Sequence, residues 1–151
     1  MSDEHPTIDD PTLGSFARAT TELTDGTVLT HDWYAGSLGD GDTAVELLIE
    51  GTSADESRWR LPRLRAVVTD LDALRRAASD AVVRAFSQGD PEPHELDDAA
   101  SDLALEAIEA TADGAVVLHF TDTCRTHFPE GYWPAVHIAD DDTIAQVTVE
   151  S

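Results

Sequence analysis

Three histidines and the only cysteine lie close together in residues 119–137, HFTDTCRTHFPEGYWPAVH. They are His119, Cys124, His127 and His137, and imidazole nitrogens and thiolates are ligands that zinc prefers. Strand alternation places His119 and His137 on the sheet face opposite their apolar neighbours. If His119 pairs directly with His137 across two antiparallel strands, Cys124 and His127 in the intervening loop would complete a zinc site.

The same residues also have a simpler explanation. Their spacing matches no standard zinc motif, and a histidine on an exposed sheet face is ordinarily a polar surface residue. Cys124 near His127 could instead act as a nucleophile, but thiol catalysis needs a positioned base and an oxyanion hole, which a sequence does not show. A zinc-dependent enzyme or sensor is therefore the alternative to a chain that works without a cofactor.

A second cluster of functional-group-bearing residues is the run RWRLPRLR, which contains Arg58, Arg60, Arg63 and Arg65. Seven of the nine arginines lie between residues 58 and 84, where only three aspartates oppose them, although the chain has a formal net charge of -22. One explanation is internal compensation: the arginines cover the edge of an apolar stripe and pair with acidic neighbours in the sheet and in residues 90–102.

The other explanation is a docking surface for a partner protein. Alternation in RWRL puts Trp59 on the side opposite Arg58 and Arg60, so guanidinium groups would stand beside an aromatic anchor. Arginine forks bind carboxylates well and tolerate desolvation. The predicted partner-binding residues are Arg58, Trp59, Arg60, Arg63, Arg65, Tyr132 and Trp133. Partners within the chain for all four arginines of the run would contradict this hypothesis.

The overall charge indicates an environment rather than an activity. There are 31 aspartates and glutamates against 9 arginines, and there is no lysine. In molar salt the Debye length is about 3 Å, which screens the repulsion within such a surface. The composition resembles that of a cytoplasmic protein from a halophilic archaeon, and we expect stability to require high salt. So acidic a chain has little attraction for phosphate backbones, so we expect no nucleic-acid partner.

Nothing in the sequence indicates export or a membrane span. No basic residue precedes Arg18, no apolar run has the length of a signal peptide, and no stretch approaches the roughly 18 apolar residues of a spanning helix. We therefore expect a cytoplasmic protein with no membrane contact. Residues 1–12 are predicted to be a mobile acidic leader, and residues 13–151 a single domain.

The elements that must position these side chains follow from periodicity. Residues 27–36 and 42–51 predict a hairpin around a Gly-Asp-Gly turn. Residues 58–88 have apolar side chains at three- and four-residue steps, which predicts one amphipathic helix or two pieces of one, with a break near Thr69 and a stop at Gly89 and Pro91. Residues 90–102 are a polar segment with one short helical turn, and four strands follow.

The length of the loop between the first two of those four strands can be predicted from which side chains must share a face. A three-residue loop of Ala112, Asp113 and Gly114 would pair Ile108 with Leu118 on one apolar face, with Gly114 in the left-handed region. A two-residue loop would pair Ile108 with a histidine instead. We therefore predict the three-residue loop.

The expected fold is α+β: an antiparallel or mixed sheet of about six strands, two before and four after one long or broken helical segment that packs across the sheet. Residues 60–150 contain an amphipathic helix, an acidic connection, an Asp-Gly turn, VVLHFTD and then Gly131, Tyr132 and Trp133. This arrangement resembles families of small microbial α+β domains of unknown function, some taken to be immunity proteins encoded beside toxin genes. The resemblance implies a binding role and no catalytic residues.

These observations together favour a non-catalytic module that binds a protein partner or regulates one. The sequence does not identify that partner.

Overall fold

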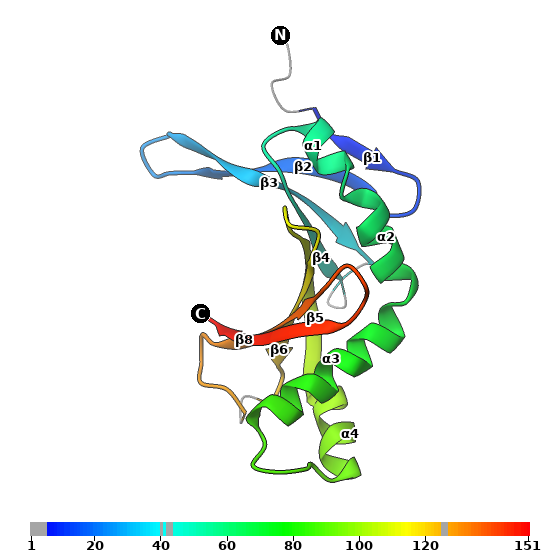
Figure 1. The fold of residues 1–151 in the computed structure, drawn as a ribbon. Helices are drawn as coiled ribbons and strands as arrows, with labels where there is room; N and C mark the ends of the chain where they lie inside the picture. The colour runs from blue at the N-terminus through cyan, green and yellow to red at the C-terminus, as the bar shows by residue number, and fades with distance from the viewer. Residues whose placement is uncertain (1–5, 40, 42–43, 125–126) are drawn as a thin grey trace.

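Eight strands form one sheet, in which every strand lies beside its neighbours in the chain (Figure 1). The structure is a computed structural model that describes residues 6–39, 41, 44–124 and 127–151. The strands are β1 (Ile8–Asp10), β2 (Gly14–Glu22), β3 (Val28–Leu38), β4 (Val45–Glu50), β5 (Leu103–Ala110), β6 (Val116–Asp122), β7 (Trp133–Ile138) and β8 (Ile144–Glu150).

Helices connect the two middle strands of the sheet. They are α1 (Ala54–Arg58), α2 (Leu61–Thr69), α3 (Leu71–Phe86) and α4 (Pro93–Asp102), and Figure 1 shows them along one side of the curved sheet. Strands β4 and β5 are parallel, with Leu47 opposite Ile108, whereas the other neighbouring pairs are antiparallel. The sheet therefore consists of two consecutive four-stranded meanders joined at this β4–β5 seam.

Local signals account for where the helices begin. The Ser53 side chain accepts a hydrogen bond from the Glu56 amide and starts α1. A capping box between Glu92 and Glu95, followed by a proline at the first helical position, starts α4. The predicted break between the two central helices is confirmed, because α2 ends at Thr69 and α3 begins at Leu71.

One face of the sheet forms the core with the helices. The side chains that point from the strands to this face alternate with more exposed ones. In β4, Leu47 and Ile49 are fully buried, whereas Glu46, Leu48 and Glu50 are not. From the helices, Leu64, Val67 and Ala78 are fully buried against them. The remaining strand residues of this core include Phe16, Tyr34, Ile108, Val116, Leu118, Phe120, Val136 and Ile138.

The predicted β5–β6 loop is confirmed. Ile108 pairs with Leu118 and Ala110 with Val116, and Gly114 has a φ of 88°. The Thr111 amide donates to the Ala115 carbonyl and closes a loop of three residues. Glycine is the residue that adopts this left-handed conformation without strain.

The expected sheet of about six strands with one long or broken helical segment is wrong. The sheet has eight strands, and helices α1 and α4 flank the broken central helix. The six predicted strands are present, but β1 and β2 were missed. Within β2 only Phe16 is buried, because the β2–β3 hairpin extends beyond the rest of the sheet (Figure 1) and residues 17–30 of its outer part include no buried side chain.

Part of the predicted leader belongs to the sheet. Residues 8–10 form β1, in which Ile8 is fully buried and pairs with Phe16. Residues 1–5 of that leader lie outside the described residues. Among the described residues, no helix is long and apolar enough to cross a membrane.

Candidate functional site

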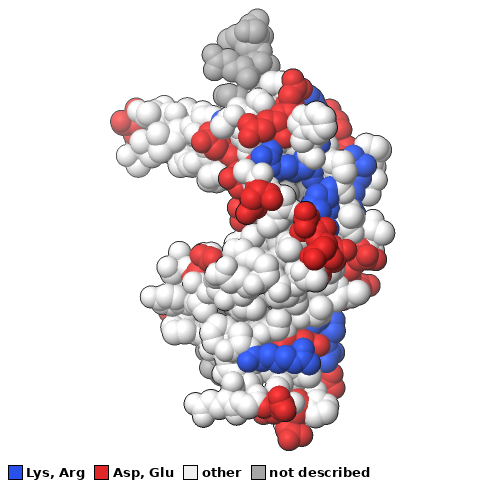
Figure 2. Space-filling view, viewed as in Figure 1, with Lys and Arg blue, Asp and Glu red and all other residues white. Residues whose placement is uncertain are grey.

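Each arginine of the RWRLPRLR run has an acidic partner within the chain. Figure 2 shows these arginines intermixed with acidic side chains on the surface over α1 and α2. The pairs are Arg58 with Asp55 at 2.7 Å, Arg60 with Glu56 at 3.6 Å, Arg63 with Asp142 at 2.6 Å, and Arg65 with Asp10 at 2.9 Å.

Two of these arginines also anchor the helices to loops of the sheet. Arg60 Nε donates to the Thr111 carbonyl at 3.2 Å, and Arg63 Nη2 donates to the Ala139 carbonyl at 2.5 Å. The arrangement is the one expected for internal compensation, and the arginine run does not meet the condition set for a docking surface. Trp59 is 85% exposed beside it, but the hollows lined by Tyr132 and Trp133 contain none of these arginines.

The predicted zinc residues separate into two groups. His119 pairs with Ala135, and His137 pairs with Val117, so the β6–β7 register differs by two residues from the one that would put the histidines side by side. His137 instead lies 3.0 Å from the Thr148 hydroxyl. The four side chains therefore do not form one site, because His119 and His137 lie on the sheet face away from the helices and the other two lie in the loop after β6.

We call the sheet face away from the helices the open face. It contains a hollow. Figure 2 shows the recess between the β2–β3 hairpin and the lower part of the molecule. Its volume is about 670 Å³. The lining residues come from β3, β4, β5, β6 and β7 and are Asp32, Trp33, Glu46, Leu48, Glu50, Glu106, Ala107, Glu109, His119 and Trp133.

Strand alternation produces this lining. In β4, Leu47 and Ile49 point into the core, so Glu46, Leu48 and Glu50 point to the open face. The pairing of β4 with its two neighbours places Glu50 across from Trp33 of β3 and Glu46 across from Ala107 of β5. The face thus has a small apolar floor with carboxylates around it.

Two indoles, those of Trp33 and Trp133, lie at the edge of the open face, and hydrogen bonds fix the second of them. Trp133 Nε1 donates to His119 Nδ1 at 3.1 Å, and His119 Nε2 lies 3.0 Å from Glu109 Oε1. Since Nδ1 accepts from the indole, Nε2 is the ring nitrogen that donates to Glu109. This relay holds the Trp133 ring in one orientation over the open face.

The second indole is held by stacking. Trp33 lies parallel to the His31 ring, with centroids 4.4 Å apart and an interplanar angle of 17°. Trp33 remains 39% exposed, so its other side is free to contact a ligand. Two oriented indoles therefore stand at the hollow, one on β3 and one on β7.

The electrostatics of the open face favour a cation. Of the residues that the structure describes, five carboxylates line it and no arginine does. Asp32 pairs with Arg18, and Glu109 with His119, but the Glu46 side chain makes no hydrogen bond or ion pair within the described part of the chain. Indole faces also attract cations through their quadrupole, so both kinds of side chain act in the same direction.

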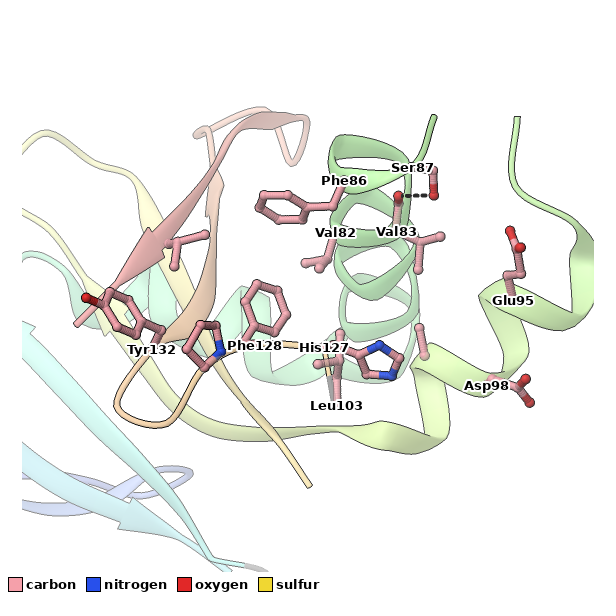
Figure 3. Close-up of a pocket in the computed structure, with 13 residues that line it drawn as sticks. Val82, Val83, Phe86, Ser87, Glu95, Asp98, Leu103, His127, Phe128 and Tyr132 are labelled. Carbon is pink, nitrogen blue, oxygen red and sulfur yellow. Dashed lines mark hydrogen bonds between the residues drawn. The ribbon is translucent and has the colours of Figure 1, made fainter. Parts of the chain in front are cut away.

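A second hollow lies between the end of α3, α4, the loop before β7, and β8. It has a volume of about 780 Å³ and a mostly apolar lining. Figure 3 shows Phe86 from α3 and Phe128 from the loop on one wall, with centroids 5.6 Å apart in an edge-to-face arrangement, and Tyr132 beside them. His127 lines this apolar groove at the end nearest α4 (Figure 3).

The loop after β6 is organised by a buried carboxylate. Asp122 accepts hydrogen bonds from the Cys124 thiol at 3.1 Å, the His127 amide at 2.8 Å and the Phe128 amide at 3.1 Å. Burial opposes the ionisation of Asp122, but these three hydrogen bonds outweigh it and hold the pKa of the carboxyl below its usual value of 3.8. Cys124 and His127 are thereby presented toward Asp102, and the ligand atoms of the three lie within 4.8 Å of one another.

Sequence reasoning missed several of these residues. Asp102 was assigned only to a polar connection, and nothing in its surroundings indicates that it meets Cys124 across the start of β5. Glu46 had a usable signal, because Glu46 and Glu50 lie among the apolar residues of VELLIE at even spacing and so predict an acidic outer face. Glu109 had none, because Glu106 and Glu109 are three residues apart and the strand carries a register shift between Leu105 and Ala107. Nothing in the sequence around Trp33 indicates that it shares a face with Trp133, which only the order of the strands in the sheet shows.

Comparison with family models, with curated proteins and with solved structures finds no match to this chain. What the protein does must therefore be argued from its own surfaces.

Proposed function

We propose that this chain is a non-catalytic binding module whose open face holds a cationic segment of a partner protein. The observation that carries the proposal is the set of five carboxylates and two oriented indoles around an apolar floor on an otherwise uncovered sheet face. Such a surface fits an arginine or lysine side chain, whose ammonium or guanidinium group meets carboxylates while its aliphatic stem contacts indole and Leu48.

The arrangement of the site favours binding over catalysis. The one imidazole among the described residues of its lining, His119, is engaged on both ring nitrogens by Trp133 and Glu109. A general base needs a free lone pair toward the substrate, and this imidazole has none in the observed arrangement. His119 therefore acts here as a positioning residue for the indole.

The composition and the resemblance of residues 60–150 agree with this role. The resemblance to families that include immunity proteins implies a module that binds a protein rather than one that transforms a substrate. In a concentrated-salt cytoplasm, long-range attraction is screened, so affinity would depend on short contacts such as those between indole faces and guanidinium groups.

The proposal is tested with a fluorescently labelled synthetic peptide that alternates arginine and glycine, titrated in molar potassium chloride and followed by anisotropy. We expect saturable binding that weakens at least about tenfold when Glu46, Glu50 and Glu109 are together changed to glutamine, a loss typical of desolvated charge pairs. The control removes the same number of charges elsewhere, by Glu22→Gln, Asp90→Asn and Asp140→Asn, at exposed positions whose side chains make no hydrogen bond or ion pair with the residues that the structure describes.

A pair of tryptophan variants locates the surface. Trp33→Ala is expected to weaken peptide binding, whereas Trp59→Ala, which removes the more exposed indole beside the arginine run, is expected to leave it unchanged. Equal losses in the two charge variants would show that the peptide responds to net charge alone and would overturn the proposal. A loss on Trp59→Ala only would move the interface to α1 and α2.

A further inference from the structure

The cluster of Asp102, Cys124 and His127 lies apart from the open face and is not used by the proposed function. Its residues come from the end of α4 and from the loop after β6. One carboxylate, one thiol and one imidazole are brought together, with all their ligand atoms within 4.8 Å of one another. Each of these side-chain types binds zinc, and three protein ligands with a fourth position left for water is the general pattern of catalytic zinc sites.

We propose that Asp102, Cys124 and His127 bind a divalent transition metal of the zinc type. The distance from His127 Nε2 to Asp102 Oδ2 is 3.3 Å. Zinc with ligands at about 2.0–2.2 Å in tetrahedral geometry requires nitrogen and oxygen ligands about 3.4 Å apart, so these two atoms are already correctly separated. The proposal differs from a site built on all four residues of the 119–137 segment, because His119 and His137 are replaced by a single aspartate.

The backbone holds the ligands in place before any metal arrives. The Asp102 carbonyl accepts hydrogen bonds from the Thr123 amide at 2.9 Å and from the Thr123 hydroxyl at 2.7 Å, which ties the end of α4 to the residue beside Cys124. Buried Asp122 ties the other side of the loop through the His127 and Phe128 amides. Ligands fixed from both sides lose little conformational freedom on binding.

Metal binding replaces at least two hydrogen bonds. The bond between His127 Nε2 and Asp102 Oδ2 is lost when both atoms become ligands, and the ring proton then resides on Nδ1. The Cys124 thiol donates to Asp122 in the metal-free protein. On binding, that S–H bond breaks, its proton leaves to solvent, and the sulfur donates an electron pair to the metal. Asp122 keeps its two amide donors and remains beside the cation, where its negative charge supports the ligands as an outer-shell carboxylate does.

The placement of His127 connects the metal to the apolar groove. Figure 3 shows its imidazole at the edge of the hollow formed with Phe86, Phe128 and Leu103. The same side chain is thus a ligand on one side and part of the groove wall on the other. A bound metal would lie at the margin of this groove.

The test is a titration of chelator-treated protein with cobalt(II), a spectroscopic substitute for zinc, in molar sodium sulfate so that chloride does not compete for the metal. We expect one equivalent to bind, with a thiolate-to-cobalt charge-transfer band and intense tetrahedral visible bands, both removed by zinc. Cys124→Ser is expected to abolish the charge-transfer band, and Asp102→Asn and His127→Gln to weaken binding at least about tenfold.

The matched controls are His119→Gln and His137→Gln, which lie on the opposite face and should bind cobalt as the wild type does. All variants are first shown by circular dichroism to be folded. A charge-transfer band that persists unchanged in Asp102→Asn and His127→Gln would mean that Cys124 binds metal as an isolated thiol, which overturns the proposal. Absence of any band in the wild type overturns it as well.

Discussion

Arg65 Nε lies 2.9 Å from Asp10 Oδ1, so a helix in the middle of the chain is joined to its first strand. The Asp10 side chain is only 2% exposed, and its other oxygen accepts the amides of Thr12 and Leu13 in the β1–β2 turn. The pair compensates a buried carboxylate rather than offering a cation to solvent. It gives the most direct answer to why arginines occur together in so acidic a chain.

Replacement of this arginine is predicted to destabilise the fold. Arg65→Gln leaves the Asp10 carboxylate buried without its counterion, and we expect a loss of about 1 to 3 kcal/mol in the free energy of unfolding. The control is Arg58→Gln, since Arg58 and Asp55 are both exposed, and such a pair contributes at most about 1 kcal/mol. Denaturant unfolding in molar potassium chloride measures both; equal midpoints for the two variants would contradict the prediction.

Glycine at position 51 is predicted to be required by the close approach of α1. A Cβ added there would overlap the Ser57 hydroxyl, whose residue is fully buried. We expect Gly51→Ala to cost about 1 to 3 kcal/mol, as overpacking does. Ser57→Ala removes the overlapping oxygen, which makes no hydrogen bond itself, and should recover part of that loss in the double variant. A double variant no more stable than Gly51→Ala would argue against this contact as the cause.

The start of α1 is predicted to depend on pH through Glu56. Hydrogen bonds from the Thr52 amide and hydroxyl lower the pKa of this carboxyl from its usual value of 4.5. A lowered pKa in the folded state means that ionised Glu56 stabilises the protein above about pH 4.5, and that this contribution is lost as the pH falls through the lowered pKa. Glu56→Gln should therefore be less stable than the wild type at pH 7 and approach it in acid. Thermal midpoints measured across this range would show a constant difference if the carboxylate were not responsible.

Salt is predicted to stabilise the fold. With a net charge of -22, self-repulsion in dilute buffer opposes the compact state, and molar salt shortens the Debye length to about 3 Å. We expect the thermal midpoint to rise as potassium chloride is added at pH 7, and to rise less at a pH low enough to protonate the carboxylates. A midpoint that falls with salt at pH 7 would show that specific ion pairs outweigh the general repulsion.

Those parts of the fold with a strong local pattern were predictable from the sequence. The β5–β6 loop followed from parity, because only one loop length keeps Ile108 and Leu118 on the same face. The break at Thr69 and six of the eight strands followed from periodicity and turn residues. Strand β2 did not, since an extended hairpin arm buries only Phe16 and therefore lacks alternation.

The candidate sites were less predictable, because they depend on relations between distant segments. The register of β6 and β7 could not be fixed across the loop after Asp122, and a shift of two residues separates His119 from His137 without changing which face either occupies. Similarly, the partners of Arg63 and Arg65 lie 79 and 55 positions away in the chain, at Asp142 and Asp10. No local pattern indicates such pairs.

The β4–β5 seam has a consequence for the order in which the chain folds. Within each meander, the connections between neighbouring strands are much shorter than the one between β4 and β5, so their pairing costs less loop-closure entropy and can form earlier. The parallel pairing of Leu47 with Ile108 must instead close over all of residues 51–102, including the helices. We therefore expect the two meanders to acquire structure before the strands between them meet, and the joining of the halves to limit the folding rate.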